Sequence, residues 1–301
     1  MQAKTTPATE LALLLGLSTL WGASYTFIKI GVETIPPVTF IAIRTLIAGL
    51  LLLAMIHWRG MALPADAATW RRFVFQACLN SAIPFCLLAW AERKMDAGLA
   101  AILNSMAPIF AFLLTVLITR HEAVTGRKLA GVVFGLAGTC LITGTQALKG
   151  LGDQVWAQLA VIAATICYAG AAIFGKSFKH LDPMMPAAGS LLSGAVILLP
   201  LSLVVDRPWA LRPSPGSLWA LLALSVFSTA LALTIYFRLL HTLGSVAATS
   251  QAYLRVPAGV AIGVIFLGEK VTPTAGMGLV CIVAGVIGMT VPSPKPARAV
   301  P

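Results

Sequence analysis

The residues of this chain that can bind a small molecule are few, and they lie within long apolar segments. They are aromatic rings, amides and one guanidinium, at Trp21, Tyr25, Asn80, Trp90, Asn104, Tyr168, Tyr236, Gln251 and Arg255. A polar atom inside an apolar segment needs a hydrogen-bond partner, so these side chains are expected to face other helices or a cavity. A cavity with this lining suits an amphipathic organic solute that carries a flat ring. Packing between helices explains any single ring equally well.

Arg44 and Arg255 are the basic residues that fall deep inside apolar segments. A charge at the centre of an isolated membrane helix costs about 2.5–3.5 kcal/mol on insertion scales, so each needs a stabilising partner. Arg44 lies nearer the outer end of the second predicted helix and is expected to anchor that helix. Arg255 lies on the helical face of Gln251. It either bonds carbonyls freed near Pro257 or offers its charge to a substrate carboxylate, and the second role is favoured.

Three prolines interrupt apolar segments, at Pro84, Pro108 and Pro257. A proline cannot donate a backbone hydrogen bond, so it frees a carbonyl one turn earlier in the helix and can kink it. Pro108 and Pro257 occupy corresponding segments of the two halves described below. We expect the three prolines to act in gating, with a static kink as the alternative.

Groups that perform catalysis are missing from the predicted spans. No Asp or Glu lies deep in a span, and the four histidines fall at span edges or in loops. The chain has no H-E-x-x-H, G-x-S-x-G or P-loop pattern, and its five cysteines have no metal-type spacing. The sequence therefore predicts a protein that is not an enzyme and has no metal or cofactor.

The elements that must position these residues are membrane-spanning helices. With 58% hydrophobic and 10% charged residues, the 301-residue chain is too apolar for a soluble domain. A bilayer core needs about 20 apolar residues per helix. The fold class is thus an all-α polytopic membrane protein with ten transmembrane helices, at about 10–30, 38–57, 73–91, 97–119, 128–146, 154–175, 185–205, 217–237, 245–267 and 272–291.

The two halves of the chain repeat one another with a shift of 147 residues. The shift aligns Trp21 with Tyr168, Pro36 with Pro183 and Glu122 with Glu269. Five crossings in each copy place the second copy in the opposite orientation, as in transporters built from inverted repeats. The predicted domains are residues 10–146 and 154–291, and the termini 1–9 and 292–301 are expected to be disordered.

The formal net charge of +11 follows membrane topology. With both termini in the cytoplasm, twelve Lys and Arg residues face the cytoplasm and seven face outward, namely Lys29, Arg93, Lys94, Lys149, Arg207, Arg212 and Lys270. This bias obeys the positive-inside rule. We therefore expect the lipid bilayer as partner, and no nucleic acid.

Several motifs resemble the EamA repeat of the drug/metabolite transporter superfamily over about residues 10–291. They are the first helix with Trp21-Gly22 and Phe27, the proline in the fourth helix, and Phe266-Leu267-Gly268-Glu269-Lys270-Val271-Thr272 before the last helix. Within the superfamily the chain most resembles the YddG-type exporters.

This resemblance implies export of amino acids, aromatic ones foremost, from bacteria across the inner membrane, by alternating access around a central cavity. The absence of acids deep in the spans predicts facilitative transport. A multidrug or other small-metabolite exporter on the same fold is the alternative, and a channel or a non-transporting sensor is the second. The sequence leaves the oligomeric state open, and a monomer is compatible with it.

Overall fold

The computed structural model describes residues 7–92, 94, 103–116, 125–143, 153–255, 257–258 and 273–290. Among these residues the regular structure is entirely helical, which confirms the prediction of an all-helical chain. The first half contains α1 (Pro7–Gly31), α2 (Pro37–Trp58), α3 (Ala67–Ala77), η1 (Cys78–Ala82), α4 (Ile83–Glu92), α6 (Ala107–Leu114) and α7 (Gly126–Thr143).

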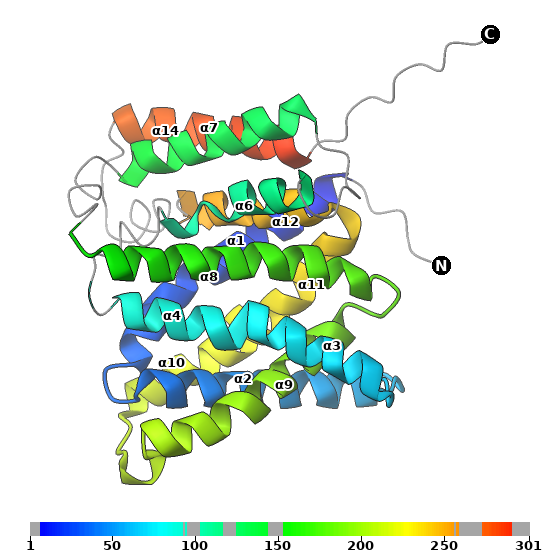
Figure 1. Ribbon diagram of the computed structural model, residues 1–301, viewed down its shortest axis with the longest axis vertical. Coiled ribbons are helices and arrows are strands. Elements are labelled where there is room, and N and C mark those ends of the chain that lie inside the picture. The colour runs from blue at the N-terminus through cyan, green and yellow to red at the C-terminus, as the bar shows by residue number, and fades with distance from the viewer. Residues whose placement is uncertain are drawn as a thin grey trace.

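The second half has a corresponding order of helices. It contains α8 (Val155–Gly175), η4 (Lys176–Phe178), α9 (Met184–Val205), η5 (Pro208–Ala210), α10 (Pro215–Ser225), η6 (Val226–Leu231), α11 (Ala232–Thr242), α12 (Ser245–Thr249) and α14 (Pro273–Thr290). Most helices run along one common direction, whereas α1 and α11 cross the bundle obliquely (Figure 1).

Helical residues occur in each of the ten predicted segments. Four helical stretches in the described part of the chain are long and apolar enough to cross a membrane. They are Pro37–Trp58, Val155–Phe178, Met184–Val205 and Pro215–Thr242. The other six crossings, and with them the count of ten, stay predictions.

The same local signals start equivalent helices in the two halves. Pro36 precedes α2 and Pro183 precedes α9, because proline fixes φ and cannot continue a helix from the preceding residues. The Asp66 carboxylate accepts a 2.8 Å hydrogen bond from the Thr69 N–H at the start of α3. At the equivalent start of α10, the Ser214 hydroxyl oxygen accepts a 3.1 Å bond from the Ser217 N–H. Such N-caps satisfy backbone donors that have no partner within the helix.

The third predicted span of each half is one continuous helical stretch, α3–η1–α4 in the first half and α10–η6–α11 in the second. Each stretch widens into a π-helix near its middle. After η1, the Ile83 N–H bonds to the carbonyl five residues earlier, at Cys78. Pro84 follows and has no N–H to restore the α-helical ladder, which gives a local cause for the widening. After η6, the Ala232 N–H likewise bonds to the Phe227 carbonyl. Single π-helical turns inside α-helices often lie at functional sites.

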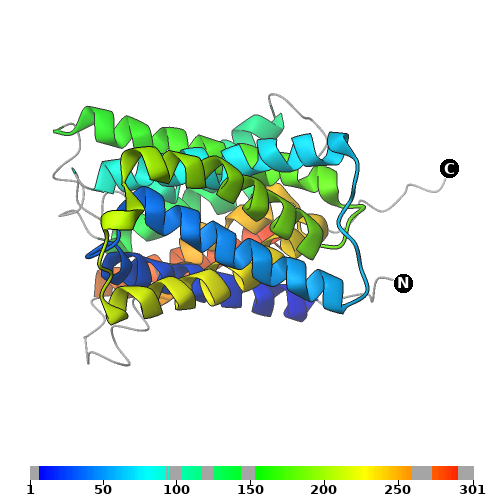
Figure 2. The same cartoon turned by 90° about the horizontal axis from the view of Figure 1, so that it is seen from below.

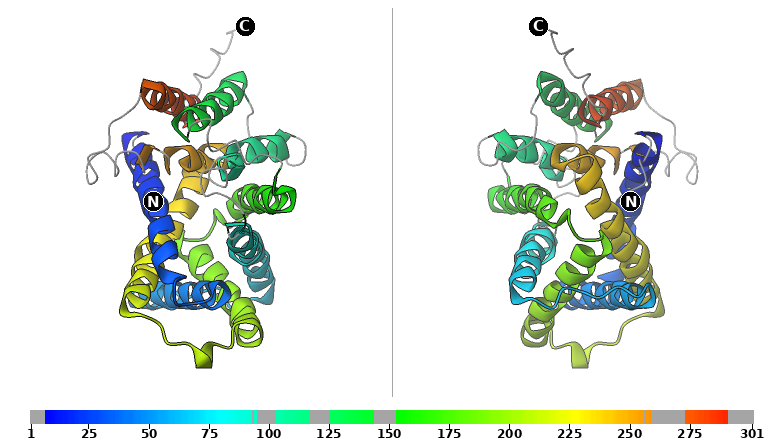
Figure 3. Two further views of the ribbon diagram at one scale, coloured as in Figure 1. Left: turned by 90° about the vertical axis from the view of Figure 1, so that its left-hand side faces the viewer. Right: turned by 90° about the vertical axis from the view of Figure 1, so that its right-hand side faces the viewer.

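The last helix of each half packs against the other through glycines. A Cβ atom at Gly131 would lie 2.6 Å from the Gly285 carbonyl oxygen, and one at Gly138 would lie 2.5 Å from that of Gly278. These pairings make α7 and α14 antiparallel, and they lie side by side in Figures 1 and 3. Close approach of small residues is a common way to associate helices in lipid.

The second helix of each half also packs against its equivalent. The helices α2 and α9 lie next to one another (Figure 2). Contacts between α4 and α8 correspond to contacts between α11 and α1. The largest buried apolar cluster contains Phe73, Phe178, Phe237 and Tyr253 and joins residues of both halves.

Candidate functional site

Trp21 joins α1 to the π-helical stretch η6. Its indole Nε1–H donates a 3.0 Å hydrogen bond to the Ser228 carbonyl oxygen. In return, the Ser228 hydroxyl donates a 2.7 Å bond to the Leu20 carbonyl oxygen. These two bonds hold the indole ring at a fixed depth against the eighth predicted span.

Two further predicted site residues, Arg255 and Tyr236, contact this indole, and a third, Gln251, bonds Arg255. The Arg255 guanidinium carbon lies 4.9 Å from the Trp21 ring centre, a cation–π distance. The Arg255 Nε–H donates a 2.8 Å hydrogen bond to Gln251 Oε1 one helical turn earlier. The Tyr236 ring centre lies 5.3 Å from that of Trp21, at an angle of 52°. We call Trp21, Tyr236, Gln251 and Arg255 the Trp21 cluster.

The chemistry of the Trp21 cluster matches a ring-bearing carboxylate. A guanidinium remains positively charged at physiological pH and presents a planar set of donors to carboxylates. The two aromatic rings offer faces and edges on which another ring can stack. Both properties come together because α1, α11 and the helical residues 251–255 meet at one place.

A second group surrounds the buried Arg44 of α2. Its Nε–H donates a 2.6 Å hydrogen bond to the Thr229 hydroxyl oxygen, and its guanidinium carbon lies 4.7 Å from the Phe85 ring centre. The Phe85 ring in turn meets Tyr168 edge-on, with 6.4 Å between centres. We call Arg44, Phe85, Tyr168 and Thr229 the Arg44 cluster. The predicted site residue Tyr168 thus lies with this group.

The sequence did not indicate Phe85 as a member of any site. A phenylalanine in an apolar helix has no feature that separates stacking from ordinary packing. The sequence did indicate Arg44 and Thr229 as unusual residues. Arg44 is a charge inside an apolar segment, and Thr229 belongs to the polar pair Ser228-Thr229, which corresponds to Asn80-Ser81 in the first half.

The two clusters leave four of the predicted site residues, namely Asn80, Asn104, Trp90 and Tyr25. Asn80 is buried in the π-helical stretch η1, and Asn104 is buried before α6. Trp90 is 43% exposed, and the Lys94 ammonium lies 4.7 Å from its ring centre. Tyr25 belongs to α1, but its side chain lies outside the described residues.

The prolines occupy three different backbone settings. Pro84 is buried in the first turn of α4, after the π-helical stretch. Pro108 lies in the first turn of α6, after a turn at residues 105–106, so it begins a helix. Pro257 lies in a short helical segment, and the same ninth span is broken at Ser250, between α12 and the helical residues 251–255. The segments of Pro108 and Pro257 are therefore discontinuous helices, whereas the segment of Pro84 is continuous through its π-helical stretch.

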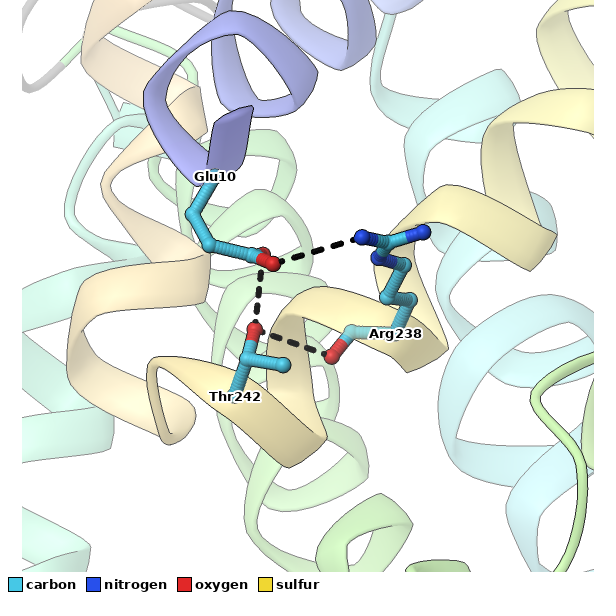
Figure 4. A network of polar contacts seen from close by, with 3 residues as sticks. All are labelled: Glu10, Arg238 and Thr242. Atoms are coloured by element: carbon cyan, nitrogen blue, oxygen red, sulfur yellow. Dashed lines mark hydrogen bonds and ion pairs between the residues drawn. The ribbon is translucent and has the colours of Figure 1, made fainter. Parts of the chain in front are cut away.

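Glu10 holds the start of α1 to the end of α11 (Figure 4). It is only 4% exposed, and its Oε2 accepts a 2.8 Å hydrogen bond from the Thr242 hydroxyl. Its Oε1 lies 3.5 Å from an Arg238 terminal nitrogen. This carboxylate therefore connects two helices at one end of the bundle.

The described residues contain no group of three or more His, Cys, Asp or Glu side chains that fits a metal ion. The five cysteines are free and half-buried.

The chain matches known transporters along nearly its whole length. The EamA-like transporter family matches it twice, over residues 8–144 and 155–291. The uncharacterised inner membrane transporter YedA of Escherichia coli K12 is 28% identical over 288 residues, which cover 92% of this chain and 89% of YedA. The uncharacterised transporter YoaV of Bacillus subtilis is 24% identical over 275 residues, which cover 91% of this chain and 94% of YoaV.

A solved crystal structure of a protein superposes on this chain with a TM-score of 0.78 at 16% identity, covering 94% of this chain and 97% of the other, and so shows a shared fold alone. The sequence-based predictions of a membrane transporter and of a protein that is not an enzyme are confirmed. The descriptions of YedA and YoaV name no substrate, so amino-acid specificity stays a prediction. Because two family matches account for most of its residues, the chain belongs to the EamA-like transporter family.

Proposed function

We propose that this protein exports amino acids, aromatic ones foremost, across the bacterial inner membrane, as the resemblance to the YddG-type exporters implies. The Trp21 cluster carries the proposal. Its guanidinium can take the α-carboxylate, and its rings can stack on a flat side chain. The Gln251 amide, which already accepts a bond from Arg255, adds a polar group on the same helical face.

The proposed architecture is ten transmembrane helices in two inverted repeats, residues 10–146 and 154–291. The antiparallel pairing of α7 with α14 supports it, because Gly131 and Gly138 align in the repeat with Gly278 and Gly285. Two equivalent helices that face each other antiparallel are related by a two-fold axis across them. Such an axis in the membrane plane relates inverted repeats.

The proposed orientation places both termini in the cytoplasm. The distribution of Lys and Arg supports it. The start of α1 and the end of α14 lie at the same end of the bundle in Figure 1, in agreement with an even number of crossings.

Transport is proposed to be facilitative. A proton-coupled carrier needs a titratable group whose protonation biases one conformation. Among the described acids, Glu10 is the buried one, and it bonds Thr242 beside Arg238 at a helix end. Guanidinium groups stay protonated at physiological pH, so an arginine cannot replace such a group.

Uptake of labelled amino acids into proteoliposomes tests the substrate. We expect saturable uptake and counterflow of tryptophan, phenylalanine and tyrosine, and weaker transport of small polar amino acids. Phenethylamine, which has the ring and ammonium of phenylalanine without the carboxylate, is the matched control. Preference for phenethylamine and other organic cations would favour a multidrug exporter. Flux without saturation or counterflow would favour a channel, and no flux a sensor.

Coupling is tested with equal phenylalanine on both sides of the vesicle membrane and an imposed pH gradient. Facilitative transport leaves the two concentrations equal. Net accumulation that an uncoupler abolishes would overturn this part of the proposal.

A further inference from the structure

Arg44 carries an unusual combination of burial and unused hydrogen-bonding capacity. The residue is 4% exposed, in the middle third of α2. Its Nε–H donates to Thr229, and its guanidinium lies against the Phe85 ring. Within the described part of the chain, its two terminal nitrogens make no hydrogen bond and no ion pair.

The terminal nitrogens of Arg44 are also not sealed in the protein. Among the described side chains, Arg44 contributes no nitrogen that is both fully buried and without a hydrogen-bond partner. The small exposed area of Arg44 therefore includes its unpaired donors. A cation needed only as an anchor would be expected to bond carbonyls with all its donors, because an unpaired polar group away from water is costly.

The surroundings of Arg44 define the ligand that fits. Two parallel N–H donors on one plane match the two oxygens of a carboxylate. Phe85 covers one face of the guanidinium, and Tyr168 meets Phe85 edge-on, so an aryl group has rings to contact beside the charge. This is the same combination of guanidinium and rings as in the Trp21 cluster.

The two clusters are adjacent but distinct. Trp21 bonds the carbonyl of Ser228, and Arg44 bonds the side chain of the next residue, Thr229, so both meet η6. The Trp21 cluster extends along α11 to Tyr236, toward the end of the bundle where Glu10 bonds Thr242. Arg44 instead lies about 10 Å along α2 from its start at Pro37, by the rise of 1.5 Å per residue.

We propose that Arg44 is a second carboxylate-binding residue, with Phe85 and Tyr168 as its aromatic wall, that takes the carboxylate of an aromatic substrate at a different depth from Arg255. This inference rests on the proposed transport of aromatic amino acids. It adds a stepwise path, in which the substrate carboxylate passes from one guanidinium to the other across η6. Each guanidinium compensates the negative charge where the bilayer excludes water.

Binding of 3-phenylpropionate and of its neutral amide to purified protein in lipid nanodiscs tests the proposal. The wild type should prefer the carboxylate. Because Arg255 is proposed to bind a carboxylate as well, this comparison is made in an Arg255→Gln background. There, Arg44→Gln should weaken carboxylate binding at least tenfold and change amide binding less than about twofold, because a neutral amide gains little from the charge. Arg44→Lys, which keeps the charge but loses the planar pair of donors, should give an intermediate loss. Arg71→Gln, which removes an exposed arginine, is the matched control and should keep the wild-type preference.

In the Arg255→Gln background, an unchanged preference for the carboxylate in folded Arg44→Gln protein would overturn the proposal and leave Arg44 as an anchor. If Arg44→Gln does not fold, Thr229→Val releases the Nε anchor and keeps the charge. It should still reduce the preference for the carboxylate, and an unchanged preference would again overturn the proposal.

The same experiments separate this inference from the proposed function. Arg44-dependent binding of 3-phenylpropionate without amino-acid transport would reject the proposed substrate and retain the Arg44 site. Amino-acid transport with a carboxylate preference independent of Arg44 would do the reverse.

Discussion

At the scale of single residues, the described partners of Arg44 and Arg255 are neutral groups. Arg255 bonds an amide and lies over an indole, and Arg44 bonds a hydroxyl and lies over a phenyl ring. Neutral partners stabilise a guanidinium without cancelling its charge. The charge of Arg44 therefore stays available to an anionic ligand, which a buried carboxylate partner would prevent.

Substitution of Trp21 separates its two contacts. Trp21→Ala removes the ring beneath Arg255 and beside Tyr236, worth about 0.5–1.5 kcal/mol beyond burial, so aromatic amino acids should bind about two- to tenfold more weakly. Trp21→Phe keeps a ring and loses the hydrogen bond to the Ser228 carbonyl. Its affinity for aromatic amino acids should lie between those of the wild type and Trp21→Ala. Direct binding measurements on purified protein check both. Wild-type affinity in Trp21→Ala would reduce this residue to packing.

Asp66 should make stability depend on pH at the start of α3. Hydrogen bonds from the backbone N–H and then the hydroxyl of Thr69 hold the pKa of the Asp66 carboxyl below its ordinary value of 3.8. The charged form is favoured in the folded protein. Its stabilisation is therefore present above pH 3.8 and is lost as the pH falls through the lower folded-state pKa.

Melting temperatures check this prediction. Asp66→Ala should melt below the wild type at about pH 7, and the difference should shrink in acid below the folded pKa. Asp66→Asn keeps a capping oxygen that does not titrate. The melting temperature of this variant should therefore change less between neutral pH and acid than that of the wild type. A difference between wild type and Asp66→Ala that is independent of pH would contradict the assignment.

At the scale of helices, the two halves use equivalent local devices at equivalent positions. The helices α3 and α10 each begin with a side-chain cap, and each continues into a π-helical stretch. The helices α7 and α14 present glycines to one another. The π-helical stretch η6 contacts both Trp21 and Arg44 through consecutive residues. A regular α-helix would place these contacts differently, so the widened turn helps position both guanidinium groups.

The packing of α7 on α14 should not tolerate a side chain at Gly138. A Cβ there would lie 2.5 Å from the Gly278 carbonyl oxygen, which is backbone and cannot move aside alone. Gly138→Ala should therefore destabilise the protein by about 1–3 kcal/mol, as overpacking of cores does. Gly276→Ala on α14 is the matched control, because nothing lies within 4 Å of its Cβ. Equal melting temperatures for the two variants would show that α7 and α14 do not meet as described.

At the scale of the whole molecule, the arrangement joins two halves through equivalent helices. The helix α2 packs on α9, and α7 packs on α14. In addition, α1 contacts α10 and α11, and α8 contacts α3 and α4. The candidate residues of both clusters come from both halves. A binding region between two repeats can change its exposure when one half moves against the other, as alternating access requires.

The proposed topology predicts opposite labelling of two matched cysteine variants. In a protein without its native cysteines, Ala210→Cys should react with an impermeant thiol reagent added to whole cells, because η5 is predicted to face outward. Ala62→Cys, in the connection before α3, should react only after the membrane is opened. Both alanines are exposed, so burial does not explain a difference. The reverse pattern would invert the orientation.

The amino-acid sequence alone determined the features that depend on composition and on local spacing. Apolar content implied a helical membrane protein, and the repeat motifs implied the family. The helix starts followed from Pro36, Pro183, Asp66 and Ser214, because proline and capping side chains act on their own backbone. These features were predictable because each depends on residues close together in the chain.

Tertiary structure decided which residues meet. Trp21 and Tyr168 align in the repeat, yet the first contacts Arg255 and Tyr236, and the second contacts Phe85. Tyr253 is fully buried, and its hydroxyl donates a hydrogen bond to the Val132 carbonyl oxygen of α7. Arg44 was expected to be an anchor, and only its approach to Thr229 and Phe85 revealed the unused donors. Such contacts depend on how distant helices cross and at what depth, and no local pattern of residues encodes that.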